Sequence, residues 1–503
     1  MPRKDTKIAN IFKPSAVDKD LKRISQLKKA TSETSHGALN LGFGLLFLLA
    51  VWLYAYLRTD GDGSVILVIA AVVGGYMAMN IGANDVANNV GPAVGSKALT
   101  MVGALIIAAI CEASGALIAG GEVVSTISKG IISTESIAST EVFIWAMMSA
   151  LLAAALWVNL ATVVGAPVST THAIVGGVLG VGVAAAGVSA VNWPVMGKIA
   201  ASWVISPVLG GFIAAMFLVF IKFAVLYRQD KIAAAQRWVP VVVAIMAGTF
   251  SVYLVMKGFK RIWKPELSII VMIGVAAFAV TYLGVRSVIA RTAEQLENRR
   301  RSVAKMFTIP LIFSAALLSF AHGSNDVANA VGPLAAIVNA VNDGEIASKA
   351  SLPLWVLAIG AIGISVGLVL FGPKIIKIVG EKITKLDQIR AFCVALSASI
   401  TVIIASGLGL PVSSTHIAIG AIFGVGLMRE ALTNRRLGQP ITQRADALAE
   451  IDDSKLFRSW RKAKKRKLVR RQHMLSIAAA WVVTVPLSAL LAALIYSIIE
   501  AIR

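Results

Sequence analysis

The chain contains few charged residues and almost no cysteine. Only 15% of its 503 residues are Asp, Glu, Lys or Arg, whereas ordinary soluble domains carry about 25%. Its two cysteines, Cys111 and Cys393, both lie in apolar stretches, which excludes a disulfide framework and a cysteine-based metal site. The sequence also lacks HExxH and clustered Cys/His patterns, so we expect neither an enzyme nor a protein-bound cofactor.

Apolar residues are correspondingly abundant. They make up 57% of the chain, and a membrane span needs only about 20 of them in a row. The composition therefore excludes a soluble, disordered or fibrous protein. It predicts an all-α, polytopic integral membrane protein, which we place in the plasma (inner) membrane. Thirteen apolar stretches are candidate helices: 38–57, 64–81, 98–119, 142–164, 172–190, 197–221, 238–256, 267–285, 306–321, 354–372, 391–406, 413–428 and 474–498.

The net charge of +22 is concentrated in polar segments between or before the apolar stretches. Most of the excess lies in residues 1–36, 286–305 and 428–473. Because Lys and Arg accumulate in cytoplasmic loops, we place these segments in the cytoplasm, with the N-terminus inside and the C-terminus outside. A basic run beside anionic lipid explains the charge, so we expect membrane lipids as partners and no nucleic acid.

Two motifs each occur twice, in the same order and at nearly equal spacing. The first, GANDVANNVGP at 82–92, recurs as GSNDVANAVGP at 323–333. The second, GAPVSTTH at 165–172, recurs as GLPVSSTH at 409–416. Two long motifs that recur in one order indicate a duplicated unit.

The loops that precede the first motif give the orientation of the two copies. The acidic loop 58–62 leads into the first copy and the basic segment 286–305 leads into the second. The copies are therefore predicted to be inverted-topology repeats, which transporters use to open one central site to either side of the membrane. We divide the chain into a cytoplasmic basic arm (1–37), an extra first span (38–57), a first membrane repeat (58–222), linking spans and basic segments (223–305), and a second membrane repeat (306–498) that includes the basic loop 428–473.

The first motif places a carboxylate beside an apolar run in each copy. An unpaired charge there costs at least about 2.5–3.5 kcal/mol, so each carboxylate needs a cation or a hydrogen-bond network; the alternative to a binding site is a polar clamp between helices. An asparagine three residues further on shares its helical face and adds a hard oxygen that suits a cation such as Na+. The glycine and proline that end each copy of this motif are expected to break the helix at this point. The candidate cation ligands are Asp85, Asn88, Asp326 and Asn329, with Asn84 and Asn325 as further candidates.

Three consecutive hydroxyl side chains follow the proline of each second motif, at the predicted start of a helix. A helix N-terminus carries about half a positive charge, and its free N–H groups together with hydroxyl donors form a cradle for an anion. The alternative is that the hydroxyls only cap their own helices. His172 and His416, which follow the hydroxyls, are expected to have a structural role. The candidate anion ligands are Ser169, Thr170, Thr171, Ser413, Ser414 and Thr415.

Together, these motifs resemble those of the PiT-type inorganic phosphate transporters, over residues 64–222 and 306–498. The resemblance implies symport of phosphate with Na+ or H+ at a central site shared by both halves. It also implies cation coupling by the acid–amide motif and phosphate binding by the hydroxyl motif, and it matches Glu112 to an acid of the family. Because a proton needs no shell of amide and hydroxyl oxygens, we favour Na+, bound at Asp85 and Asp326, as the coupling ion.

Two other functions remain open at this point: transport of another tetrahedral oxyanion such as sulfate, and an anion channel. Phosphate can donate a hydrogen bond, whereas sulfate at neutral pH cannot, so an acceptor such as Asp85 or Asp326 near the anion would favour phosphate. We expect secondary active symport by alternating access. The expected partners are inorganic phosphate, coupling cations and membrane lipids, with a homodimer as a candidate assembly.

Overall fold

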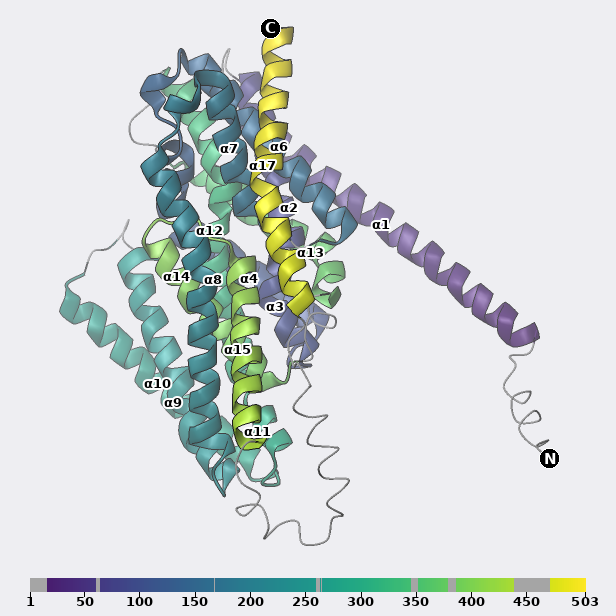
Figure 1. The fold of residues 1–503 in the computed structure, drawn as a ribbon, viewed down its shortest axis with the longest axis vertical. Helices are drawn as coiled ribbons and strands as arrows, with labels where there is room; N and C mark the ends of the chain where they lie inside the picture. Colours follow the sequence, from purple (N-terminus) through teal and green to yellow (C-terminus); the bar gives the residue numbers. More distant parts are fainter. Residues whose placement is uncertain are drawn as a thin grey trace.

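The computed structural model describes residues 16–59, 64–166, 168–258, 263, 265–344, 352–378, 386–437 and 471–503. These residues form an almost wholly helical protein (Figure 1). The only pairing of extended backbone among them is one isolated bridge between Ile132 and Val191. The all-α prediction is confirmed.

Many of the helices are long enough and apolar enough to cross a membrane. Eleven helical segments of the described chain meet these criteria, or twelve if the bent pair α11 and α12 counts as one span. This confirms a multi-pass membrane protein. Each of the thirteen predicted stretches overlaps a described helix, although α7 has only 17 residues and is shorter than a span. The helices are α1 (Ala16–Arg58), α2 (Ser64–Asn84), α3 (Val86–Gly95), α4 (Met101–Ala119), α5 (Gly121–Ser125), α6 (Thr140–Val164), α7 (Thr170–Ala186), α8 (Trp193–Ile221), α9 (Lys231–Tyr253), α10 (Leu267–Ala293), α11 (Arg300–Met306), α12 (Thr308–Asp343), α13 (Leu354–Ile378), α14 (Gln388–Gly407), α15 (Ser414–Leu437) and α17 (Arg471–Ile502).

The first helix is longer than the predicted first span. Residues 16–58 form one continuous helix, so the expected boundary between an arm at 1–37 and a span at 38–57 is not a break in secondary structure. Helix α1 projects away from the bundle (Figure 1). Its side chains at Leu41, Leu45 and Leu49 are 58–59% exposed, as expected for a helix surface that contacts lipid. Residues 1–15, and most of the predicted basic loop 428–473, lie outside the described part of the chain.

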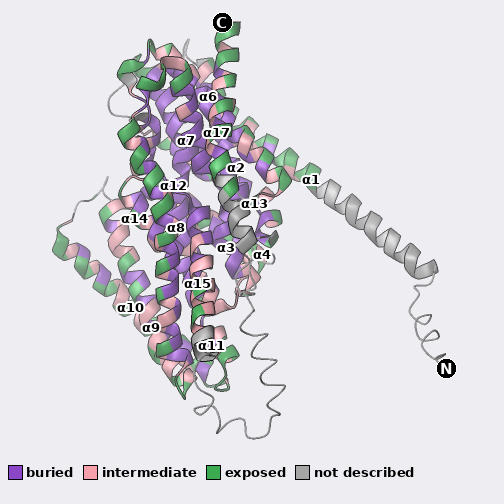
Figure 2. Cartoon of the chain, viewed as in Figure 1, coloured by how far each residue is buried: buried purple, intermediate pink, exposed green. Residues whose placement is uncertain are grey.

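The first motifs lie on helices at the centre of the bundle, where side chains are most deeply buried (Figure 2). In the first copy, Asp85 forms a one-residue turn between α2 and α3. In the second copy, α12 continues through the whole motif. The prediction that Gly–Pro interrupts both helices is therefore wrong, because Pro92 lies inside α3 and Pro333 inside α12. Both prolines are buried by neighbouring helices, and such packing lets a helix tolerate the missing backbone donor.

Two helical hairpins carry the second motifs to the centre. Helices α6 and α7 turn at Gly165, and α14 and α15 turn at Gly409. Both glycines adopt left-handed backbone, with φ of 80° and 69°, which is unfavourable for residues with a Cβ. The Thr171 hydroxyl donates to the Val412 carbonyl at 3.0 Å, so the two hairpin tips touch. Helix α7 lies in the upper half of Figure 1 and α15 in the lower half. The N-terminal ends of α7 and α15, which carry the second motifs, therefore meet at the centre of the bundle.

A lysine holds the turn of each hairpin. The Lys374 ammonium in α13 donates to the Val163 carbonyl at 3.2 Å. The Lys257 ammonium, just beyond α9, donates to the Gly407 carbonyl at 3.0 Å and lies 3.6 Å from Glu122 Oε1. The two carbonyls stand at the same place, two residues before the turn glycine. Lys257, which follows α9 between the two repeats, therefore connects the second hairpin to Glu122 of the first repeat.

Close helix contacts show which residues of the two repeats correspond. A Cβ on Gly82 in α2 would meet the carbonyl of Ile364 in α13, and a Cβ on Gly323 in α12 would meet the carbonyl of Glu112 in α4. Small residues allow such close approach of membrane helices. Because Gly82 and Gly323 occupy the same position of the first motif, Ile364 occupies in one repeat the place that Glu112 occupies in the other.

Candidate functional site

The predicted site residues are all buried, where the first motifs meet the hairpin tips. None of them is more than 2% exposed. The set comprises Asn84, Asp85, Asn88, Glu112, Ser169, Thr170, Thr171, Asn325, Asp326, Asn329, Ser413, Ser414 and Thr415. The structure therefore joins the candidate cation ligands and the candidate anion ligands into one centre.

One asparagine of each repeat connects the first motif to its own hairpin. Asn84 Nδ2 donates to Thr162 Oγ1 at 2.9 Å and to the Ala166 carbonyl at 3.2 Å, and Asn84 Oδ1 accepts from the Val168 N–H at 3.2 Å. Asn325 makes the same three contacts in the second repeat, at 2.9, 3.2 and 3.3 Å, with Ser406, Leu410 and Val412. These two amides fix the hairpin turns against the helices that carry the aspartates.

The carboxylate of Asp85 accepts hydrogen bonds from both hairpins. Thr170 donates to Asp85 Oδ2 at 2.6 Å, and Thr415 of the other repeat donates to Oδ1 at 3.1 Å. Each of these hydroxyls in turn accepts from an amide: Thr415 from Asn88 at 2.8 Å and Thr170 from Asn329 at 3.1 Å. Amide, hydroxyl and carboxylate thus form a chain that crosses between the repeats three times.

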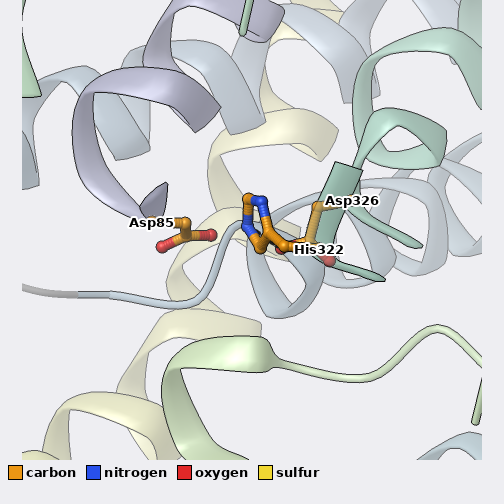
Figure 3. A group of neighbouring side chains, drawn as sticks. All are labelled: Asp85, His322 and Asp326. Carbon is orange, nitrogen blue, oxygen red and sulfur yellow. Dashed lines mark ion pairs between the residues drawn. The ribbon is translucent and has the colours of Figure 1, made fainter. Parts of the chain in front are cut away.

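The carboxylate of Asp326 has different surroundings. Its Oδ2 atom accepts from Ser414 at 3.3 Å and lies 2.6 Å from His322 Nε2. Within the described residues, Asp326 Oδ1 and Asn329 Oδ1 are buried without a hydrogen-bond partner. A buried acceptor without a partner costs about 1–3 kcal/mol, so these hard oxygens suit a small cation. One ligand atom each of Asp85, His322 and Asp326 lies within 4.8 Å of the others (Figure 3).

The first serine of each hydroxyl triplet caps a helix. Ser169 Oγ accepts from the His172 N–H at 3.1 Å and Ser413 Oγ accepts from the His416 N–H at 3.3 Å. The His172 ring stacks on Trp203 with ring centroids 3.8 Å apart, and lies 4.4 Å from the His416 ring. These contacts support a structural role for the histidines, and they give each of the two serines a capping role in this structure.

His322 is the functional candidate that the repeated motifs did not reveal. Its Nδ1 atom lies 2.7 Å from Glu112 Oε2, and Glu112 Oε1 accepts from Asn89 Nδ2 at 2.8 Å. The His322 ring therefore lies between Glu112 and Asp326 and contacts both carboxyl groups. The signal in the sequence was a difference between the two copies, because His322 stands where the first copy has Ile81.

The whole arrangement can be compared with known proteins. The family model described as the phosphate transporter family matches residues 81–492. The chain belongs to the phosphate transporter family. Similar proteins include a candidate phosphate permease of Helicobacter pylori, 46% identical over 522 residues, with 95% of this chain and 98% of that protein covered. Another candidate phosphate permease, from Pyrococcus abyssi, is 35% identical, with 86% of this chain and 98% of that protein covered.

A solved structure is also similar to this phosphate transporter. It is that of a sodium-dependent phosphate transporter and matches with a TM-score of 0.75 and 34% sequence identity, covering 87% of this chain and all of the other. The resemblance noted from the motifs is therefore confirmed, together with phosphate transport as the function. Both copies of both motifs fall within the matched residues 81–492.

Proposed function

We propose that this phosphate transporter is a symporter that couples phosphate entry to Na+ by alternating access. The observation that carries the proposal is the direct contact between the two ligand sets. Asp85 accepts from Thr170 and Thr415, and Asp326 accepts from a hairpin hydroxyl in the same way. The candidate anion ligands are thus hydrogen-bonded directly to the candidate cation ligands. Binding of an ion at one set therefore alters the hydrogen bonds of the other.

The cation is assigned to the acid–amide motif. Asp326 Oδ1 and Asn329 Oδ1, which are buried without a partner among the described residues, supply two hard oxygens, and Asp85 and Asn88 supply the matching pair in the other repeat. Na+ prefers such ligands. The sodium dependence of the transporter with the similar solved structure supports the same ion.

Phosphate is assigned to the hydroxyls and backbone N–H groups at the starts of α7 and α15. In this structure the hydroxyls of Thr170, Ser414 and Thr415 donate to carboxylates. A cation bound to Asp85 would compete with Thr170 and Thr415 for the carboxylate oxygens and release these two hydroxyls. The released donors can then turn to the oxygens of phosphate, beside two positive helix ends. This exchange couples the two substrates.

The membrane potential requires more than one cation. An inside-negative potential opposes entry of the phosphate dianion by about 4.6 kcal/mol per 100 mV, at about 2.3 kcal/mol for each charge. Two Na+ ions, one at each aspartate, cancel the dianion. A third cation, or the monoanion of phosphate, makes entry electrically favourable.

In this proposal the two repeats, 58–222 and 306–498, are inverted halves that exchange conformations to give alternating access. The N-terminus lies in the cytoplasm and the C-terminus lies outside. In a cysteine-free background, Thr59→Cys is expected to react with an impermeant maleimide only from outside the cell. Ser454→Cys, in the basic loop, is expected to react only after the membrane is permeabilised. Labelling of Ser454→Cys in intact cells would contradict this topology.

Ion coupling is tested with purified transporter in proteoliposomes. A Na+ gradient without a pH gradient is expected to drive accumulation of radiolabelled phosphate, and a tenfold excess of sulfate is expected to leave it nearly unchanged. A pH gradient without Na+ is the matched comparison. Accumulation that follows the pH gradient and ignores Na+ would assign the coupling to protons, and inhibition by sulfate would show that the site accepts tetrahedral oxyanions in general.

A further inference from the structure

The two repeats differ sharply in one polar feature beside the aspartates. In the aligned first motifs, His322 stands opposite Ile81 and Asn89 stands opposite Ala330. The close helix contacts place Glu112 opposite Ile364. Ile81, Ile364 and Ala330 are all buried. Three polar groups around Asp326 therefore correspond to three apolar side chains around Asp85.

The three polar groups form a continuous chain that ends on Asp326. Asn89 donates to Glu112 Oε1 at 2.8 Å, Glu112 Oε2 lies 2.7 Å from His322 Nδ1, and His322 Nε2 lies 2.6 Å from Asp326 Oδ2. The chain runs from α3 through α4 to α12, and every member is buried. Figure 3 shows the ring beside Asp326, on the side toward Asp85.

This chain makes the two carboxylates unequal as cation ligands. At Asp85, both oxygens accept from hydroxyls, at 2.6 and 3.1 Å, so an incoming cation competes with a hydrogen bond at either oxygen. At Asp326, Oδ2 is held while Oδ1 has no hydrogen-bond partner among the described residues. A cation at Oδ1 displaces nothing.

We propose that His322 is a positioning residue that, through Glu112 and Asn89, orients the Asp326 carboxylate and makes it the tighter of two unequal Na+ sites. The inference rests on the proposed Na+ coupling. Na+ binds first at Asp326 and does not need phosphate. The second Na+ binds at Asp85 together with phosphate, because only then do the hydroxyls leave that carboxylate.

Binding of 22Na+ to purified transporter in detergent tests the proposal without transport. The wild-type protein is expected to bind one Na+ tightly without phosphate and a second when phosphate is added. Loss of an outer partner of a metal ligand typically weakens binding by about 10–100-fold. We therefore expect His322→Ile, which installs the residue of the other repeat, to raise the dissociation constant of the tight site at least about tenfold.

Two milder variants keep the test usable if His322→Ile does not fold. Glu112→Gln and Asn89→Ala are each expected to weaken the tight site in the same direction, by smaller factors. Ile81→Val, at the mirror position, is the control and is expected to bind as wild type. In proteoliposomes, the variants should need more Na+ for half-maximal uptake while keeping their maximal rate within about a factor of two at saturating Na+.

The outcomes separate this inference from the proposed function. If wild-type protein binds Na+ and folded variants bind it equally well, the positioning role is overturned and Na+ coupling stands. A lower maximal rate with an unchanged Na+ requirement would also overturn it, because a merely structural role has that effect. If wild-type protein binds no Na+, both the coupling ion and this inference are wrong.

Discussion

Replacement of Asp85 or Asp326 by asparagine is expected to lower Na+-driven phosphate accumulation at least about a hundredfold. Each carboxylate is buried and accepts hydrogen bonds from hairpin hydroxyls. An amide keeps the size of the side chain but cannot neutralise a cation. Removal of one partner from a buried ion pair costs about 3–5 kcal/mol, and each 1.4 kcal/mol is about a factor of ten. Uptake of radiolabelled phosphate into proteoliposomes measures the loss.

The matched control is the same substitution at Asp387. Asp387 caps α14 by accepting from the Arg390 N–H at 3.0 Å, and asparagine is an equally good capping residue. Asp387→Asn also loses partly exposed ion pairs with Arg300 and Arg390. Such pairs contribute at most about 1 kcal/mol, so this variant is expected to transport as wild type. If both site variants still accumulated phosphate against its gradient with unchanged ion dependence, the aspartates would be structural and the coupling mechanism would fail.

Replacement of Ser169, Thr170 and Thr171 together by alanine is expected to abolish phosphate binding while leaving membrane insertion intact. The substitution removes three hydroxyls at the start of α7, including the one that links Asn329 to Asp85. Without them, phosphate would meet backbone N–H groups alone. We expect the dissociation constant for phosphate to rise at least about a hundredfold, the equivalent of two net hydrogen bonds at about 1.5 kcal/mol each. Equilibrium binding of radiolabelled phosphate to purified protein gives the result.

A single substitution separates capping from binding. Ser169 accepts from the His172 N–H, so Ser169→Ala alone is expected to destabilise the protein by about 1 kcal/mol with a much smaller effect on phosphate affinity. Ser114→Ala is the control, because this exposed hydroxyl donates only to its own helix. Wild-type phosphate affinity in the triple variant would show that the hydroxyls serve only as caps.

The sequence predicted the composition of the centre but not its connections. Asp85, Asp326 and the hydroxyl triplets stand out as polar groups in apolar surroundings, and their recurrence marks them as a set. Spacing along the chain does not show which repeat a side chain contacts. The bond from Thr415 to Asp85 joins residues 330 positions apart, and it depends on how the hairpin tips pack.

Two features of the centre were not predicted correctly, for different reasons. Gly–Pro was expected to break both central helices, yet Pro92 and Pro333 lie within helices, because tertiary packing overrides a local preference. His322 was missed because recurrence marks only residues present in both copies. Its importance lies in a difference between the copies, at a position where Ile81 keeps the other side apolar.

That difference has a consequence for how such a molecule can be built. A dimer of two identical half-chains would carry the Asn–Glu–His chain twice or not at all. Two copies would bury four ionisable side chains beside the aspartates, whereas Glu112 and His322 are the two present here. Halves joined in one chain can diverge in sequence and keep a single copy. The covalent link through α9 and α10 thus permits a nearly symmetric cage around an asymmetric centre, in which one side fills before the other.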